Sequence, residues 1–176
     1  MDACIETARL VLRPYAKTDL DALHRLWTDP DVRRYLFDDE ILARQSVAAE
    51  IEHSLACFET QGFGQWAMFL KSHDALIGFC GYHSFHDPPE VQLIYGLAPD
   101  HWGQGLAAEA ARAIIRYSFE TLSFDEIIAS TDPPNKASIR VMEKVGMNFQ
   151  KRVLIDGLDM IYYAISRATF EAVDLP

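Results

Sequence analysis

Two closely spaced glycines stand in the middle of the chain. Gly103 and Gly105 lie in the segment LAPDHWGQGLA, residues 97–107, which follows an apolar run typical of a strand and precedes an alanine-rich stretch typical of a helix. Glycines let the backbone approach a ligand without a Cβ, and the first N–H groups of a helix attract an anion. The segment is therefore compatible with a phosphate site or with a plain tight turn. It contains neither the GxxxxGK(S/T) pattern of ATP-binding loops nor the full GxGxxG pattern of dinucleotide-binding folds.

A second segment, residues 135–147 (NKASIRVMEKVGM), predicts a short helix that opens directly after a strand. Asn135 is a natural N-cap. Ser138 falls in the first turn, where its hydroxyl is either exposed to solvent or available to a ligand. The apolar residues at helical spacing are expected in the core rather than at a cofactor; they are Ile139, Met142 and Val145.

The two segments together carry a family resemblance. WGQGLAAEA, followed about 30 residues later by PNKASIRVMEKVGM, resembles the GNAT superfamily of N-acetyltransferases and specifically its RimJ/RimL-like branch. The likeness extends from TARLVLRPY near the start to the last predicted hairpin. It implies one acetyltransferase domain over residues 1–176, with a mixed sheet that splays between its fourth and fifth strands and acetyl-CoA in the opening.

The resemblance also implies which residues hold acetyl-CoA. Gly105 and Ala107 match the last two fixed positions of the family's phosphate loop, Q/R-x-x-G-x-G/A, whereas Trp102 stands where Gln or Arg is usual and is expected to pack under the loop. Backbone N–H groups of the loop would hold the pyrophosphate, and Ser138 would lie near the thioester sulfur. The expected contacts are Leu97 and Ala98 on the pantetheine, Gly103, Gln104, Gly105, Leu106, Ala107 and Ala108 on the pyrophosphate, and Asn135 and Ser138 at the pantetheine amides and the sulfur.

The general base is less clearly marked. Relatives often carry Glu where this chain has Gln92, and an amide cannot take up a proton at neutral pH. Asp159, which matches an acidic position of this branch, is the first candidate, and Glu90, two residues before Gln92 on the same strand face, is the second. Either residue alone is also compatible with a solvated carboxylate at a turn. Histidine titrates near neutrality in general, and the remaining candidates are His83, His86 and His101, although single histidines more often serve packing or lie on the surface.

The acceptor is not named by any motif. The acidic segment 35–40 (YLFDDE) falls between the first two predicted helices, where GNAT proteins often build the acceptor pocket, and it would attract a cation or simply form a solvated loop. The resemblance favours a protein N-terminal α-amine, with a small amine also possible. A different class of function, a non-catalytic acyl-CoA-binding or regulatory module, is supported by Gln92 alone.

Composition excludes several classes of function. The 176 residues include 26 acidic and 16 basic side chains, and the net charge of -10 opposes binding to nucleic acid or anionic membranes. The cysteines have no metal-ligand or disulfide spacing, so neither a metal site nor a disulfide framework is expected; they are Cys4, Cys57 and Cys80. A cytoplasmic protein is expected, because the N-terminus resembles no signal peptide and no apolar run approaches the roughly 18 residues that span a bilayer. Monomer and homodimer remain open.

The elements that must position these residues follow from periodicity and turn signals. Thr18 is expected to cap the first helix, which Asp29-Pro30 ends. The turn Asp87-Pro88-Pro89 and the hairpin signal Asp156-Gly157 separate neighbouring strands. Strands are expected at residues 9–15, 65–71, 75–85, 91–97, 127–131, 149–155 and 160–166, and helices at residues 18–28, 44–60, 103–122 and 137–145. This order predicts an α/β (α+β) fold with a mixed, mostly antiparallel sheet of about seven strands flanked by four helices.

Overall fold

The computed structural model describes residues 3–85, 89–155 and 157–172, and its centre is one mixed sheet. The strand order is β1-β2-β3-β4-β5-β6-β8-β7, with every neighbouring pair antiparallel except the parallel pair β5 and β6. The strands are β1 (Ile5–Glu6), β2 (Leu10–Pro14), β3 (Gln65–Leu70), β4 (Leu76–Phe85), β5 (Glu90–Leu97), β6 (Glu126–Thr131), β7 (Asn148–Ile155) and β8 (Leu158–Ser166). The predicted fold class is confirmed.

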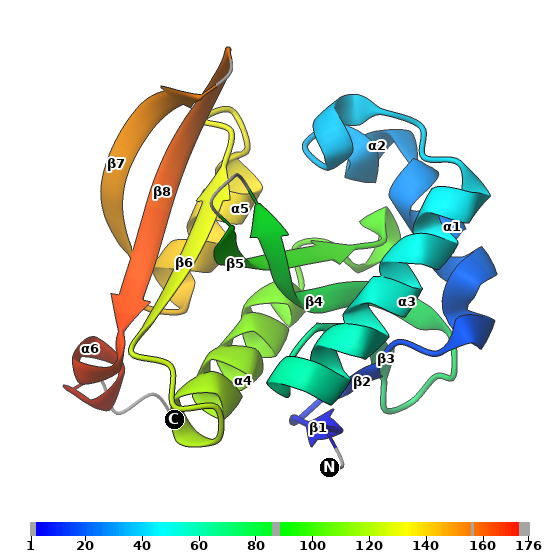
Figure 1. The fold of residues 1–176 in the computed structure, drawn as a ribbon, viewed down its shortest axis with the longest axis horizontal. Helices are drawn as coiled ribbons and strands as arrows, with labels where there is room; N and C mark the ends of the chain where they lie inside the picture. Colours follow the sequence, from blue (N-terminus) through cyan, green and yellow to red (C-terminus); the bar gives the residue numbers. More distant parts are fainter. Residues whose placement is uncertain (1–2, 86–88, 156, 173–176) are drawn as a thin grey trace.

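The sheet splays between β5 and β6. These two strands share a single residue pair, Gln92 with Ile128, whereas β4 and β5 remain paired from Phe85 and Glu90 to Gly78 and Leu97. In Figure 1 the arm formed by β6, β8 and β7 leans away from the remaining strands beyond this point. The predicted splay between the fourth and fifth expected strands is confirmed; these strands are β5 and β6 because the two-residue β1 precedes them.

Helices cover the two faces of the sheet. On one face, α1 (Leu20–Thr28) and α3 (Arg44–Gln61) pack against β3 and β4; on the other lie α4 (Leu106–Glu120) and α5 (Lys136–Lys144) (Figure 1). Strand alternation sends Phe79 of β4 into the α1/α3 core and its neighbour Cys80 into the α4/α5 core. The two faces therefore have separate hydrophobic cores. Alternate residues along a strand point to opposite faces, so a residue's place in this alternation, its strand parity, gives the face on which it lies.

The helix boundaries show where local sequence signals were sufficient. Asp29 accepts from the N–H groups of Asp31 and Val32, and Pro30 opens α2 (Pro30–Arg33), so the predicted end of the first helix is confirmed. Gly62, with φ of 80°, closes α3 as expected.

Other boundaries differ from the prediction. Thr18 does not cap α1: it lies within the 3-10 turn η1 (Lys17–Asp19), and Asp19 takes the N-cap position, with its carboxylate bonded to Ala16 N–H and to Arg13. The long helix begins at Leu106 rather than Gly103, because both loop glycines adopt positive φ. The sequence did not predict β1, α2, the 3-10 turns η2 (Phe37–Asp39) and η3 (Pro99–His101), or α6 (Arg167–Ala172).

Two predicted turns extend beyond the described part of the chain. His86, Asp87, Pro88 and Asp156 lie outside the described residues, whereas Gly157 has a φ of 86° between β7 and β8, as a hairpin turn requires. Among the residues that the structure does describe, no helix combines the length and apolar character needed to cross a membrane.

Candidate active site

The glycine segment forms an open loop at the start of α4. Gly103 and Gly105 have φ values of 72° and 78°, and Gly105 is the N-cap of α4. A Cβ placed on Gly103 would meet no atom within 4 Å, so the space above the loop is open. The first N–H groups of a helix have no partner within it, and here they belong to Leu106, Ala107 and Ala108. An open cradle of backbone donors at a helix N-terminus suits a diphosphate.

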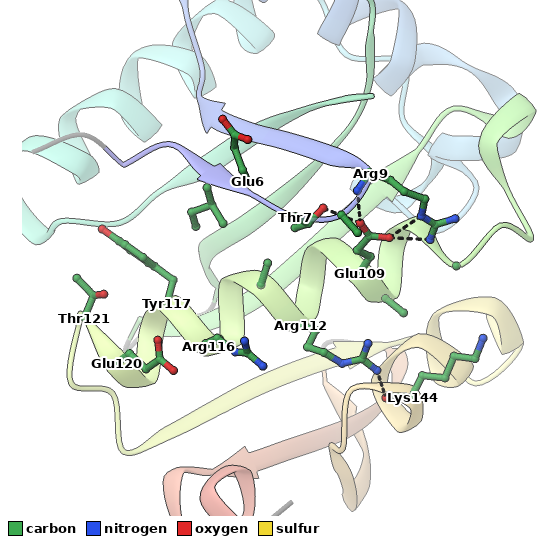
Figure 2. A pocket seen from close by; sticks show the side chains of 15 residues that line it. Glu6, Thr7, Arg9, Glu109, Arg112, Arg116, Tyr117, Glu120, Thr121 and Lys144 are labelled. Carbon is green, nitrogen blue, oxygen red and sulfur yellow. Dashed lines mark hydrogen bonds and ion pairs between the residues drawn. The ribbon is translucent and has the colours of Figure 1, made fainter. Parts of the chain in front are cut away.

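Two side chains tie this loop to the rest of the molecule. Trp102 Nε1 donates to the carbonyl oxygen of Leu97 at 2.8 Å, and Arg9 donates to the carbonyl oxygen of Gln104 at 3.0 Å. Arg9 is held in turn by Glu109 on the first turn of α4, with Nε 2.7 Å from Oε2 (Figure 2). The loop is thus fixed from β5 on one side and from the segment before β2 on the other.

Glu109 collects three hydrogen bonds. Its Oε1 accepts from Thr7 Oγ1 at 2.6 Å and from Arg9 N–H at 2.9 Å, and its Oε2 accepts from the Arg9 guanidinium. Partial burial alone would raise the pKa of this carboxyl, but the bonds from Thr7 and Arg9 outweigh burial and lower the pKa. The charged form of Glu109 therefore anchors the N-terminal segment to α4.

A groove of about 700 Å³ runs along the same side of α4, between this helix and the N-terminal segment (Figure 2). Arg112, Arg116 and Lys144 line it together with Glu109. Among the predicted site residues, Gly105 and Ala108 border the groove and the others do not. The groove thus lies behind the phosphate loop, away from the splay between β5 and β6.

Backbone groups of β5 face that splay. In an antiparallel ladder, residues that bond to the neighbouring strand alternate with residues whose N–H and C=O groups point away from it. Ala98 N–H donates to the carbonyl of Ile77 at 2.8 Å, so the groups of Leu97 and Tyr95 point toward β6, which no longer pairs with β5 there. The N–H and C=O groups of Tyr95 and the N–H group of Leu97 therefore face the opening, whereas the Leu97 carbonyl accepts from Trp102 Nε1. Ala98 is used within the protein, because its carbonyl also accepts from His101 N–H.

The N-terminus of α5 lies across the opening from β5. Asn135 Oδ1 accepts from Ser138 N–H at 3.2 Å, which confirms the predicted cap, and Asn135 Nδ2 donates to Thr131 Oγ1 at 3.1 Å. Tyr95 donates its hydroxyl to the Ser138 carbonyl at 3.0 Å, so its oxygen is free to accept the Ser138 hydroxyl proton at 2.9 Å. Burial raises the pKa of Tyr95 and keeps this phenol protonated. No sequence motif marked Tyr95; only strand alternation with Leu93 and Leu97 placed it on this face.

A row of polar side chains occupies the opposite, α1/α3 face at the closed end of the splay. Gln92 is 1% exposed; its Nε2 donates to Glu90 Oε1 at 2.7 Å, and its Oε1 accepts from Ser130 of β6 at 2.6 Å. Burial and the nearby charge of Glu90 raise the pKa of Tyr162 on β8. Gln92 therefore bridges β5 and β6, and Glu90 joins the same group as expected from the sequence.

The row continues onto β4 and α3. His83 is the partner of Gln92 in the β4–β5 ladder, and its Nδ1 lies 3.0 Å from Glu50 Oε1. The same oxygen accepts from Gln65 Nε2 at 2.5 Å, and Gln65 in turn accepts from the Tyr15 hydroxyl at 2.8 Å. Sequence reasoning named His83 only as one histidine among three and missed Glu50, which lies 33 residues away on a helix.

The structure does not bring Asp159 to this row. Asp159 has the strand parity of Ile161 and Tyr163, which pack in the α4/α5 core, so it faces away from Glu90 and Gln92. It pairs with Arg152 across the β7–β8 hairpin, with Arg152 Nε 2.8 Å from Oδ1. Hydrogen bonding and the charge of Arg152 lower the pKa of Asp159. Asp159 is thus an ion-paired carboxylate on the hairpin.

The acidic segment between α1 and α3 is held by contacts with Arg33 and Trp27. Arg33 donates to the Asp39 carbonyl at 2.6 Å and forms an ion pair with its carboxylate at 3.2 Å. Phe37 and Asp39 have φ values of 54° and 62°, and the Phe37 ring packs edge-on against Trp27 with 5.2 Å between ring centroids. The charge of Asp39 is therefore partly neutralised.

Within the described residues, no group of three or more His, Cys, Asp or Glu side chains is placed to hold a metal ion.

Comparison with known proteins identifies the family. A family model described as an acetyltransferase (GNAT) domain matches residues 9–148. The uncharacterized N-acetyltransferase p20 of Bacillus licheniformis is 32% identical over 154 residues, which cover 85% of this chain and 83% of that relative. The spermidine N(1)-acetyltransferase of Escherichia coli (strain K12) is 24% identical over 144 residues, 81% of this chain and 75% of the relative.

A solved structure agrees with these relatives. The structure of RimL, a ribosomal L7/L12 alpha-N-protein acetyltransferase in complex with coenzyme A, has a TM-score of 0.78 over 93% of this chain and 97% of that chain. At 15% sequence identity this likeness concerns the fold, and the RimJ/RimL-like branch stays a prediction. The match over residues 9–148 is broader than half of the chain, and the chain therefore belongs to the GNAT family of acetyltransferases, enzymes that take the acetyl group from acetyl-CoA.

Proposed function

We propose that the amine acceptor reaches the opening between β5 and β6 from the α1/α3 face and is a peptide N-terminal α-amine or a small amine. The main support is the arrangement of the opening itself. Backbone groups of Tyr95, the N–H group of Leu97 and the hydroxyl of Ser138 line one side, whereas the polar row of Glu90, Gln92 and Ser130 marks its closed end on the other face. An acyl donor and an amine can thus meet from opposite faces.

Each residue of the donor side has a definite part in this proposal. Backbone donors at the start of α4 bind the pyrophosphate, and the C=O and N–H groups of Tyr95 with the N–H group of Leu97 bind the pantetheine as an added strand would, since the Leu97 carbonyl already accepts from Trp102 Nε1. An N–H group of Tyr95 or Leu97 stabilises the charge that develops on the thioester oxygen. Ser138 gives a proton to the departing sulfur, and Asn135 keeps the first turn of α5 in place through its cap on Ser138 N–H.

The two carboxylates named from the sequence differ in their suitability as proton acceptors. Asp159 is bound to Arg152, which lowers the pKa of this carboxyl and makes it a weak base. Glu90 accepts a hydrogen bond from the neutral amide of Gln92 within the polar row. We therefore place Glu90 before Asp159 among the carboxylates, which reverses the order expected from the sequence.

Gln92 bears on the kind of amine. An α-amine with a pKa near 7.7 to 8.0 is roughly 10% neutral at pH 7, whereas a lysine amine near 10.4 is neutral about once in 2,500 molecules. A site with an amide where relatives often carry a carboxylate is expected to favour amines of low pKa.

The family's use of acetyl-CoA and the relative named as a spermidine acetyltransferase favour catalysis over the non-catalytic alternative.

A screen of acceptors tests the proposal. Release of free CoA from acetyl-CoA is measured with peptides of varied N-termini, with the same peptides blocked at the N-terminus but carrying lysine, with polyamines and with aminoglycosides. Faster turnover with free N-terminal or small low-pKa amines is expected. Turnover confined to lysine side chains would contradict the acceptor class, and no turnover with any amine, despite acetyl-CoA binding, would revive the non-catalytic module.

A further inference from the structure

We propose that His83 is the group that takes the proton from the acceptor amine, and that Glu50 is the positioning residue that holds His83 for this step. The inference rests on the proposed function, and it names a proton acceptor that lies one strand away from Gln92. It is carried by the position of His83 in the sheet and by its pairing with Glu50.

The ladder between β4 and β5 places His83 beside the closed end of the splay. His83 is the residue opposite Gln92, and the hydrogen-bond alternation set by Ala98 and Ile77 makes this a bonded pair, with Cα atoms about 5.5 Å apart. Opposed residues project from the same face of the sheet. His83 therefore stands on the α1/α3 face, next to Gln92, from which we expect the amine to enter.

Glu50 determines which nitrogen of His83 carries a proton. An ionised carboxylate only accepts hydrogen bonds, so Nδ1, at 3.0 Å from Glu50 Oε1, is the protonated nitrogen of the neutral ring. The lone pair is then on Nε2, which can accept a proton, and the carboxylate stabilises the positive charge that results. Both side chains are half-buried, with 26% of His83 and 19% of Glu50 exposed.

Glu50 is itself fixed from behind. Gln65 is 2% exposed and donates to Glu50 Oε1, and the buried Tyr15 hydroxyl donates to Gln65. Burial, together with the charge of Glu50, raises the pKa of Tyr15, so this phenol stays a donor. A carboxylate held by a buried amide and a phenol has little freedom to leave His83.

Other titratable groups near His83 come from each element that packs against it. From α3, His53 and Cys57 line the same small hollow as His83; from β4, Tyr82 lines it too. Burial raises the pKa of Tyr82, and burial with the charge of Glu50 raises the pKa of Cys57, so both are neutral near pH 7. From β5, Glu90 reaches the row through Gln92. The groups near His83 are thus the carboxylates of Glu50 and Glu90 and the imidazole of His53.

The proton balance is complete without any further reactant. The ammonium of the acceptor gives one proton to His83 Nε2, directly or through one water molecule. The nitrogen lone pair then forms the N–C bond to the acetyl carbonyl, the C–S bond breaks, and the sulfur leaves with that electron pair. The second proton from the nitrogen reaches the sulfur by way of the Ser138 hydroxyl. His83 returns its proton to water.

The test compares His83→Gln, Glu50→Gln and Glu90→Gln with the parent. For each protein, kcat/KM with the best amine of the acceptor screen is measured from pH 5.5 to 10, and the acetyl-CoA Kd is measured at pH 7. His83→Gln is expected to lower kcat/KM about 100-fold at pH 7, the usual size of general-base catalysis. Its rate should approach the parent's as the pH nears the amine's own pKa.

Glu50→Gln should instead lower kcat/KM at the plateau about tenfold with an unchanged acetyl-CoA Kd, because a neutral amide can donate to Nδ1 as well as accept from it and no longer fixes the proton on that nitrogen. A purely structural pair would change the melting temperature or the acetyl-CoA Kd and leave the pH profile in place. As a second readout, free imidazole should restore part of the activity of His83→Ala and none of that of Glu90→Gln.

The outcomes separate the two levels of the proposal. Full activity of His83→Gln at pH 7 with an unchanged pH profile, a larger loss in Glu90→Gln, or no rescue of His83→Ala by imidazole would overturn the role of His83 while the acetyl transfer stands. A parent that releases no CoA with any amine would overturn the proposed function instead.

Discussion

The two ends of the opening are built in different ways. The phosphate loop is made by one continuous segment, residues 97–108, whose glycines and helix start offer backbone donors. The polar row beside Gln92 is made by side chains from α3, β3, β4, β5 and β6, including Glu50, His83 and Ser130. A site made of backbone groups is determined by residues adjacent in the sequence, whereas a site made of side chains depends on which strands and helices become neighbours in the fold. Substitutions should therefore act locally at the loop and through partners in the row.

Gly105→Val is expected to have the largest effect. A β-branched residue at φ of 78° is strained, and its Cβ would lie 3.7 Å from Arg9 Nη2, beside the guanidinium that holds the loop through Gln104, so the loop should lose its shape. Acetyl-CoA affinity should fall about 100-fold or more, measured by calorimetry or ligand-induced melting shifts. Gly62→Val is the matched control, because Gly62 has nearly the same φ, 80°, at the end of α3. The control should lose stability and keep its affinity for acetyl-CoA; equal loss of affinity in both variants would mean that strain, not the loop, is responsible.

The same contrast explains how much the sequence could predict. The glycine loop, the Asn135 cap and the splay all follow from local spacing plus a family resemblance, and the structure has each of them. The end of α1 at Asp29-Pro30 could also be predicted from the sequence, because Asp and Pro act on adjacent backbone groups. The prediction that Thr18 caps α1 was wrong because Asp19 takes this position, where its carboxylate binds Arg13 of β2. No local sequence pattern indicates that contact.

The side-chain partners could not be predicted. Tyr95 meets Ser138 only because β5 and α5 face each other across the splay, 43 positions apart in the chain. Glu50 meets His83 because α3 packs on the face that strand parity gives to His83. Asp159 is a carboxylate at a position where the resemblance expects one, yet its place in the strand alternation turns it to the other face and to Arg152. Pairings of this kind are determined by tertiary packing, which the periodicity of apolar residues in the sequence does not predict.

Ser138→Ala should have the next largest effect. The hydroxyl is proposed to act on the leaving sulfur, so kcat should fall about tenfold or more while the acetyl-CoA Kd changes less than about twofold. Tyr95→Phe serves as the control, because it removes the partner of Ser138 at 2.9 Å and leaves the serine in place. A smaller loss of kcat is expected for Tyr95→Phe. Parallel changes of kcat and Kd in Ser138→Ala would assign this serine to binding instead.

Glu109→Gln should have a smaller effect that depends on pH. The folded state lowers the pKa of Glu109, so its charged form contributes stability that is present above the unfolded value near 4.3 and is lost as the pH falls through the lower folded value. The variant should be about 1 kcal/mol less stable than the parent at pH 7, and the difference should shrink below pH 4.

The loop should respond as well, because Arg9 holds Gln104 through this carboxylate. A two- to fivefold weaker acetyl-CoA Kd, on the order of 0.4 to 1 kcal/mol, is expected for Glu109→Gln at pH 7. Lys17→Gln is the control, since it breaks an exposed ion pair, Lys17–Glu52, that includes no residue of the loop. A stability difference that grows toward low pH would show that the sign assigned to Glu109 is wrong.

The smallest effect is expected for Asp159→Asn. Asp159 faces away from the polar row, and Arg152 lowers the pKa of its carboxyl, so it stays ionised through the working pH range and is a poor proton acceptor. Its exposed ion pair joins two strands of a hairpin that β6 already supports, so loss of the charge should leave kcat/KM within about threefold of the parent from pH 6 to 9. Arg152→Gln should behave in the same way, since it breaks the same pair from the other side. If Asp159→Asn instead costs a hundredfold and Arg152→Gln does not, the carboxylate acts on the amine after all, and the hairpin must bring Asp159 to the opening when both substrates are bound.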